Sequence, residues 1–264
     1  MKILPIRNPF GAPVFHEDTV SSTMDVARSC AGAGMAHGTV ITADFQEAGR
    51  GRLKRLWSNE KGKNLLFTIL LRYENFSVFP LALTLRAGLA VSLALEDFAP
   101  ALCGLVKVKW PNDVMISAGG DGVMRKAAGI LAETDGEKVF LGVGVNVAQK
   151  EFPADCRSKA ASLIHALPDL GEDARFSLLE KILTRLHDEI EQPSNGKNDN
   201  AWCGPLLQRL YKKGEKVIFA DGAAGSNRLV TGILSGLGPN GELVLIPDGE
   251  AEEREFVAGE LQVY

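Results

Sequence analysis

Short apolar runs and longer periodic stretches alternate along the first half of the chain. Each short run has the length of a strand buried within a sheet, and turn residues lie between the runs. The turn between the last two is Asp135-Gly136, a favourable hairpin sequence. The predicted strands are 39–45, 64–72, 106–110, 114–116, 128–133 and 139–147.

Helices are predicted where apolar residues recur every three to four positions. Ser21, Ser22 and Thr23 precede an Asp-Val-Ala-Arg run, and hydroxyl side chains are favoured helix N-caps. The region from about 148 to 211 is expected to be mainly helical, with residues 192–200 as a polar surface loop. The predicted helices are one after Thr23, 80–98, 176–190 and 201–211.

The last 50 or so residues have a different texture, with several short strands between glycine-containing turns. This pattern predicts a small β-barrel. We therefore expect two domains, residues 1–211 and residues 212–264. The fold class is α+β.

Charge, cysteine content and hydropathy limit the classes of protein to which this chain can belong. The 264 residues carry a net charge of −4, which argues against sequence-independent nucleic-acid binding. The four cysteines form no CxxC pair, as expected for reduced thiols in a cytoplasmic protein. No targeting segment is visible, and charged residues interrupt the most apolar stretch, 79–98. A buried helix is favoured there over a membrane span.

The most unusual segment runs from Gln46 to Trp57 and contains Arg50, Arg52, Lys54 and Arg55 between glycines. Glycines let a ligand approach the backbone, and arginines bind phosphate or carboxylate through paired hydrogen bonds. The segment is therefore a candidate anion clamp, and a solvated basic loop is the alternative. It matches neither the dinucleotide fingerprint nor the Walker A loop.

Three other segments carry candidate chemistry, and each has a structural alternative. Residues 107–113 (KVKWPND) end in turn chemistry, so Asn112 and Asp113 can be plain turn residues. Residues 125–131 place Lys126 at the start of a strand, where a lysine can also guard an edge. Residues 142–146 (GVGVN) predict a strand with close contacts on one face, where Asn146 is either structural or a ligand contact. The four histidines show no metal-ligand spacing, so the metal ligands stay unknown.

Taken in order, these segments resemble the bacterial biotin protein ligases, the form without an N-terminal DNA-binding domain. The resemblance covers roughly residues 14–264. Its specificity comes from the order of motifs that are individually weak: Ser22-Thr23, Gln46 with Gly49-Arg-Gly-Arg52 and Trp57, Lys109-Trp-Pro-Asn-Asp113, Lys126-Ala-Ala-Gly-Ile-Leu131, Gly142-Val-Gly-Val-Asn146, Phe152-Pro153 with Ala161-Ser-Leu163, and Gly259-Glu260.

The resemblance implies a mixed sheet related to class II aminoacyl-tRNA synthetases and lipoate ligases, followed by an SH3-like barrel. It also implies an enzyme that uses ATP and Mg²⁺ to convert biotin to biotinyl-5′-adenylate. Biotin then passes to a lysine of the carboxyl carrier protein of acetyl-CoA carboxylase or another biotin-dependent carboxylase. DNA binding is not expected, since only about 20 residues precede Ser22. A homodimer is possible within the family.

The resemblance further assigns roles to individual residues. It divides them into three sets: catalytic residues, residues that contact biotin, and residues that contact the nucleotide. The catalytic set consists of cations expected near the reacting anions. The expected catalytic residues are Arg50, Arg52 and Lys126. The expected biotin contacts are Ser22, Thr23, Gln46, Gly49, Arg50, Gly51, Arg52, Lys126 and Gly129. The expected nucleotide contacts are Arg52, Arg55, Trp57, Lys109, Asn112 and Asn146.

The chain departs from the family pattern at Met24, where asparagine is usual, and at Leu53-Lys54, where Arg-Gly is usual. The arginine that some relatives carry near the chain end is absent. The alternatives are a lipoate or octanoate ligase of the same fold, a degenerate protein that binds biotin or a carrier without turnover, and a DNA-binding regulator.

Overall fold

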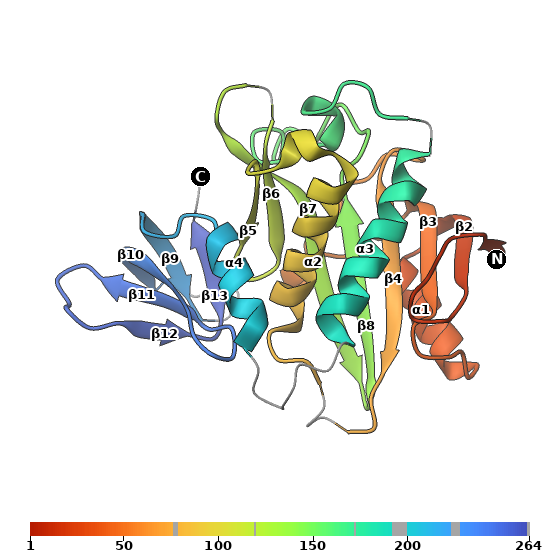
Figure 1. The fold of residues 1–264 in the computed structure, drawn as a ribbon, viewed down its shortest axis with the longest axis horizontal. Coiled ribbons are helices and arrows are strands. Elements are labelled where there is room, and N and C mark those ends of the chain that lie inside the picture. Colours follow the sequence, from red (N-terminus) through yellow and green to blue (C-terminus); the bar gives the residue numbers. More distant parts are fainter. Residues whose placement is uncertain (76–78, 119, 172, 192–199, 223–227, 263–264) are drawn as a thin grey trace.

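The main sheet has eight strands in the order β1-β2-β3-β4-β8-β7-β6-β5 (Figure 1). The computed structural model describes residues 1–264 except 76–78, 119, 172, 192–199, 223–227 and 263–264. Strands β2 and β3 pair in parallel, and the other neighbours are antiparallel. The strands are β1 (Lys2–Leu4), β2 (Val14–Val20), β3 (Val40–Gln46), β4 (Leu65–Arg72), β5 (Val106–Lys109), β6 (Asp113–Ser117), β7 (Met124–Asp135) and β8 (Lys138–Val145).

All six predicted strands are present, and the Asp135-Gly136 hairpin is confirmed by the pairing of Asp135 with Lys138. Strand β7 begins earlier than predicted because its polar start pairs with β6, Arg125 with Ile116 and Lys126 with Met115. Strands β1 and β2 were not predicted. The polar residues His16 to Asp18 interrupt the apolar pattern of β2, which is held instead by its pairing with β3.

Among the described residues, four α-helices connect or flank the strands: α1 (Thr23–Gly32), α2 (Leu83–Phe98), α3 (Ala174–Ile190) and α4 (Cys203–Arg209). Ser22 is the N-cap of α1, and its hydroxyl accepts a hydrogen bond from the Met24 amide. Helix α2 starts three residues later than predicted because Ala82 is left-handed, with φ of 52°. Residues 148–162 form loops rather than helix, and most of the predicted loop 192–200 lies outside the described residues.

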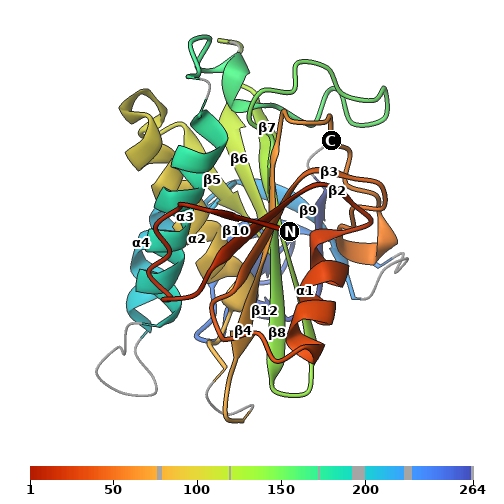
Figure 2. The same ribbon diagram turned by 90° about the vertical axis from the view of Figure 1, so that its right-hand side faces the viewer.

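The helices cover the sheet unequally. Helix α1 lies on one face, and α2 and α3 lie together on the other (Figure 2). Alternate residues of the central strands face each side, so Phe67, Ile130 and Val143 join the core under α2 and α3. Within the described residues, no helix is long and apolar enough to cross a membrane.

A second, antiparallel sheet follows, in the order β12-β11-β10-β9-β13. Its strands are β9 (Lys216–Asp221), β10 (Leu229–Leu237), β11 (Leu243–Pro247), β12 (Arg254–Phe256) and β13 (Gly259–Gln262). The predicted strands are confirmed, but closure into a barrel is not, since the pairings among described strands leave β12 and β13 at the edges.

This second sheet does not have a core of its own. Phe219 and Leu245 share one apolar cluster with Trp110 and with Leu89 of α2. The Trp110 indole also donates a hydrogen bond to the Gly241 carbonyl at 2.9 Å. These contacts hold the second sheet against α2 and Trp110, while the domain boundary at residue 211 stays a prediction.

Candidate active site

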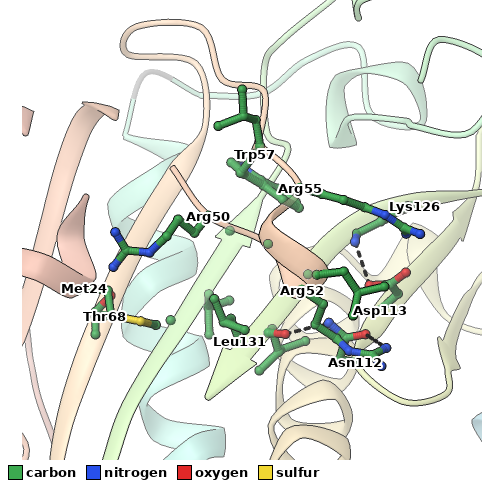
Figure 3. A pocket seen from close by; sticks show the side chains of 18 of the residues that line it. Met24, Arg50, Arg52, Arg55, Trp57, Thr68, Asn112, Asp113, Lys126 and Leu131 are labelled. Carbon is green, nitrogen blue, oxygen red and sulfur yellow. Dashed lines mark hydrogen bonds and ion pairs between the residues drawn. The ribbon is translucent and has the colours of Figure 1, made fainter. Parts of the chain in front are cut away.

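A cavity of about 170 Å³ lies where the start of α1, the Arg-rich loop (residues 46–57) and the central strands meet (Figure 3). Strands β4, β6, β7 and β8 form its floor, and Glu260 of β13 reaches its rim. Segments that are more than 200 residues apart in the sequence therefore contribute to one site. Its lining is polar but uncharged at one end and charged at the other.

Glycines on neighbouring strands make room for large side chains in the cavity. A Cβ at Gly144 would lie 2.6 Å from the Trp57 ring, and one at Gly129 would lie 2.9 Å from it. A Cβ at Gly142 would lie 2.9 Å from Cε of Met24. The predicted close contacts on one face of this strand are thus confirmed. The indole of Trp57 packs over bare backbone at the middle of the floor.

One end of the cavity carries polar groups without charge, and we call it the amide end: Ser22, Thr23, Gln46 and Thr68. The Gln46 Oε1 atom accepts hydrogen bonds from the Thr23 amide at 2.8 Å and from its hydroxyl at 3.0 Å. The Thr23 and Thr68 hydroxyls lie 2.9 Å apart. All four residues are buried, so a ligand at this end meets fixed hydrogen-bonding groups rather than water.

The Arg-rich loop folds back on itself above the cavity. The Gly51 amide donates to the Arg55 carbonyl at 2.8 Å, and the Trp57 amide donates to the Gly49 carbonyl at 2.9 Å. Between these contacts, Leu53 and Lys54 both have φ of 59°. This left-handed conformation costs non-glycine residues energy. The strained pair coincides with the Leu53-Lys54 departure from the family pattern, where Arg-Gly is usual and glycine stands at the second position.

The loop arginines have different partners. Arg50 forms a bidentate pair with Asp25 of α1, at 2.6 and 3.0 Å, and points away from Lys126 (Figure 3). Hydrogen bonds from Arg50 lower the pKa of Asp25. Arg55 forms a bidentate pair with Glu260, at 2.8 and 2.9 Å, and these hydrogen bonds lower the pKa of the Glu260 carboxyl.

Arg52 makes longer contacts than either neighbour. Its guanidinium donates to the Asn112 side chain and to the Gly259 carbonyl, both at 3.3 Å. Both acceptors are neutral, and neither bond is short. Within the described ion pairs, Arg52 has no carboxylate partner. An arriving anion can therefore bind Arg52 without displacing another anion.

The other end of the cavity concentrates charge, and we call it the charged end: Arg52, Lys109, Asp113, Lys126 and Glu260. Lys126 Nζ lies 2.6 Å from Asp113 and 5.4 Å from the centre of a Trp57 ring. Lys109 is only 5% exposed, and burial lowers its pKa while Asp113 and Glu260 oppose that shift. Cations and carboxylates thus face one another at this end of the cavity.

Most of the residues predicted from the sequence meet in this cavity. Those that line it are Ser22, Thr23, Gln46, Arg50, Gly51, Arg52, Arg55, Trp57, Lys109, Asn112, Lys126 and Gly129. Gly49 lies behind Gln46, where a Cβ would be 2.9 Å from Nε2. Asn146 does not line the cavity, and its amide instead donates to the Ala161 carbonyl at 3.1 Å. The individual roles stay predictions.

The structure adds residues that the predicted set lacked. Asp113 and Glu260 were within recognised motifs but were not assigned a role, and Thr68 had no motif at all. The available signal for Thr68 was a hydroxyl residue within the otherwise apolar run 65–71. Met24 also lines the cavity, with its side chain buried against Gly142.

A second polar cluster lies away from this cavity. Ligand-type atoms of His16, Asp18 and Asp44 lie within 4.8 Å of one another. Arg175 donates to Asp44 at 2.7 Å, so one carboxylate is already neutralised by a cation. This arrangement is better explained as an ion pair that fixes α3 to the sheet than as a metal centre.

Comparison with known proteins places this geometry in a family. Residues 18–149 match the model of the biotin/lipoate A/B protein ligase family. The chain is 36% identical to the biotin--[acetyl-CoA-carboxylase] ligase of Mycobacterium tuberculosis, over 67% of this chain and 63% of that protein. It is 32% identical to the bifunctional ligase/repressor BirA of Bacillus spizizenii, over 59% of this chain and 47% of that protein.

Solved structures give the same result across nearly the whole chain. The biotin protein ligase from Aquifex aeolicus, in complex with biotin and ATP, superposes with a TM-score of 0.76 at 27% identity. That match covers 94% of this chain and 97% of the Aquifex chain. The curated relatives are longer, and this chain spans about half the length of the Bacillus protein.

Proposed function

The chain belongs to the biotin/lipoate A/B protein ligase family, and on that premise we propose that it activates biotin with MgATP and transfers it to a carrier protein. The observation that carries the proposal is the division of one cavity into an amide end and a charged end. Biotin has the matching division, a neutral ureido ring at one end and a carboxylate at the other. The carboxylate is expected beside Trp57 and Lys126, and the ring beside Gln46.

In the first step, a biotin carboxylate oxygen attacks the α-phosphorus of ATP, and pyrophosphate leaves. Two anions must approach, so cations held in place before the reaction lower the barrier. Lys126 and Arg52 are the groups proposed to supply this positive charge, and the buried Lys109 is proposed to add to it. When the ligand carboxylate binds, it replaces Asp113 as the partner of Lys126.

Asp113 and Glu260 are the carboxylates of the charged end, and Mg²⁺ prefers such oxygen ligands. Their chemistry fits the ion, although each now pairs with a cation. We propose that these two carboxylates would hold Mg²⁺, which would supply further neutralisation of phosphate charge.

In the second step, a lysine amine of the carrier attacks the carbonyl carbon of the adenylate, and AMP leaves. The name of the Mycobacterium relative indicates the carrier protein of acetyl-CoA carboxylase as the acceptor. The second sheet is proposed to be an SH3-like module that flanks the approach. The Arg-rich loop (residues 46–57) is proposed to shield the acyl-phosphate bond of the adenylate from water.

Pyrophosphate exchange into ATP tests the first step. We expect exchange that depends on biotin and is absent with lipoate or octanoate. Exchange with lipoate or octanoate alone would keep the mechanism but overturn the substrate. If no acid supports exchange while biotin still binds, the protein is a binding protein without turnover. Transfer is then measured separately as labelled biotin on a purified carrier domain.

A further inference from the structure

The hydrogen bonds at the amide end run in one direction, and the structure determines which. The backbone amide of Thr23 can only donate, so the Gln46 side-chain atom 2.8 Å away must be its oxygen. That oxygen also accepts the single hydroxyl proton of Thr23, at 3.0 Å. A carbonyl oxygen has two lone pairs, so the Gln46 oxygen is fully used.

It follows that Thr68 is the donor in its 2.9 Å contact with Thr23, because the Thr23 proton is already committed. The chain of bonds therefore runs from Thr68 to Thr23 to Gln46. The far end is the Gln46 Nε2 group, with two N–H donors and no acceptor among the described residues. Gly49, which has no Cβ, leaves room beside this nitrogen.

We propose that Thr68 is a positioning residue for substrate recognition. Its hydroxyl fixes the orientation of Thr23 and Gln46, so that Gln46 offers only donors to the ligand. The matching ligand feature is a neutral carbonyl oxygen, and this inference rests on the proposed function in taking it to be the ureido oxygen of biotin. A dithiolane ring has no such acceptor, so the arrangement discriminates against lipoate.

The variant Thr68→Val removes the hydroxyl but keeps the side-chain shape. Without its donor, the buried Thr23 hydroxyl loses a partner, and the Gln46 amide is held less firmly. We expect KM for biotin in pyrophosphate exchange to rise about tenfold, with KM for ATP and kcat little changed. Thr68→Ser restores the hydroxyl and should return KM for biotin to within about twofold of the parent value.

Thr42→Val is the matched control. Thr42 is another buried threonine on the neighbouring strand, and its hydroxyl donates to the Leu66 carbonyl at 2.8 Å, outside the cavity lining. It should lower thermal stability as Thr68→Val does while leaving KM for biotin unchanged. Equal KM values in the two valine variants would overturn the proposal.

A second readout separates this inference from the proposed function. The side-chain amide resonance of Gln46, assigned by its loss in Gln46→Leu, reports the chain of bonds without any ligand. It should shift in Thr68→Val but not in Thr42→Val. If the parent protein shows no exchange with biotin, the proposed function fails, and this resonance still decides the role of Thr68. An unshifted resonance would overturn that role.

Discussion

The amide end and the charged end of the cavity are built in different ways. At the amide end, Thr23, Gln46 and Thr68 lie within 46 residues of sequence and satisfy one another through hydrogen bonds. At the charged end, Lys126 is held by Asp113 of a neighbouring strand, and Glu260 of the second sheet is paired with Arg55 of the loop. The first end is preorganised for a neutral group, and at the second Lys126 must exchange partners to accept an anion.

The largest effect is expected from Lys126→Ala, which removes a cation from the charged end. The rate of biotin-dependent exchange should fall by about 10²- to 10³-fold, since charge stabilisation in the transition state is lost. Circular dichroism should show an unchanged fold. The exposed lysine Lys61 gives the control, because Lys61→Ala should exchange at the parent rate. Near-parent exchange in Lys126→Ala would contradict the assignment of this end.

Gly144→Ala tests the middle of the cavity, where the ends meet. The new methyl would lie 2.6 Å from the Trp57 indole, and the ring must move. We expect catalytic efficiency to fall by about tenfold or more, with a shift in tryptophan emission. In Gly142→Ala the group that must move is the flexible end of Met24, so the loss should be smaller. Equal losses in the two variants would mean that Trp57 is not held in a required position.

The charged end should respond to alkaline pH, and the amide end should not. Burial lowers the pKa of Lys109 from the usual 10.5, so this lysine begins to lose its charge at a lower pH than an exposed lysine does. The charged form exists below the lowered pKa and is lost as pH rises through it. KM for ATP should therefore increase on the alkaline side while KM for biotin stays level. Lys109→Arg should move that limb to higher pH. If the alkaline rise in KM for ATP stays at the same pH in this variant, a group other than Lys109 causes it.

The smallest effect on stability is expected from Glu260→Gln, which weakens the contact between the second sheet and the loop. The Arg55 side chain is well exposed, at 63%, so the pair is worth less than about 1 kcal/mol. The melting temperature should change little, while proteolysis at the loop should become faster. Because Arg55 lowers the pKa of Glu260, the pair is intact above the usual carboxyl range and is lost as pH falls through the lowered value. If the rate of proteolysis did not depend on pH across that range, the Arg55–Glu260 pair would not be what holds the loop.

The predictions from sequence succeeded where a residue's environment is local. Ser22 is a cap because its own backbone and hydroxyl start a helix, and Gly142 and Gly144 mark close contacts because only a missing Cβ allows them. They failed for β1 and β2, whose polar residues are ordered by pairing with a neighbour. They also missed the break in the helix expected from residue 80, where Ala82 adopts a left-handed conformation.

The same distinction applies to the site. The sequence by itself determined the motif order, the cationic loop and the mixed α+β class, because these depend on residue type and short spacing. Only the tertiary structure decided that Glu260 meets Arg55, that Asp113 holds Lys126, and that the Thr68 and Thr23 hydroxyls meet. Those contacts join strands and loops up to 205 residues apart, and the direction of a hydrogen bond depends on which fixed donor lies opposite.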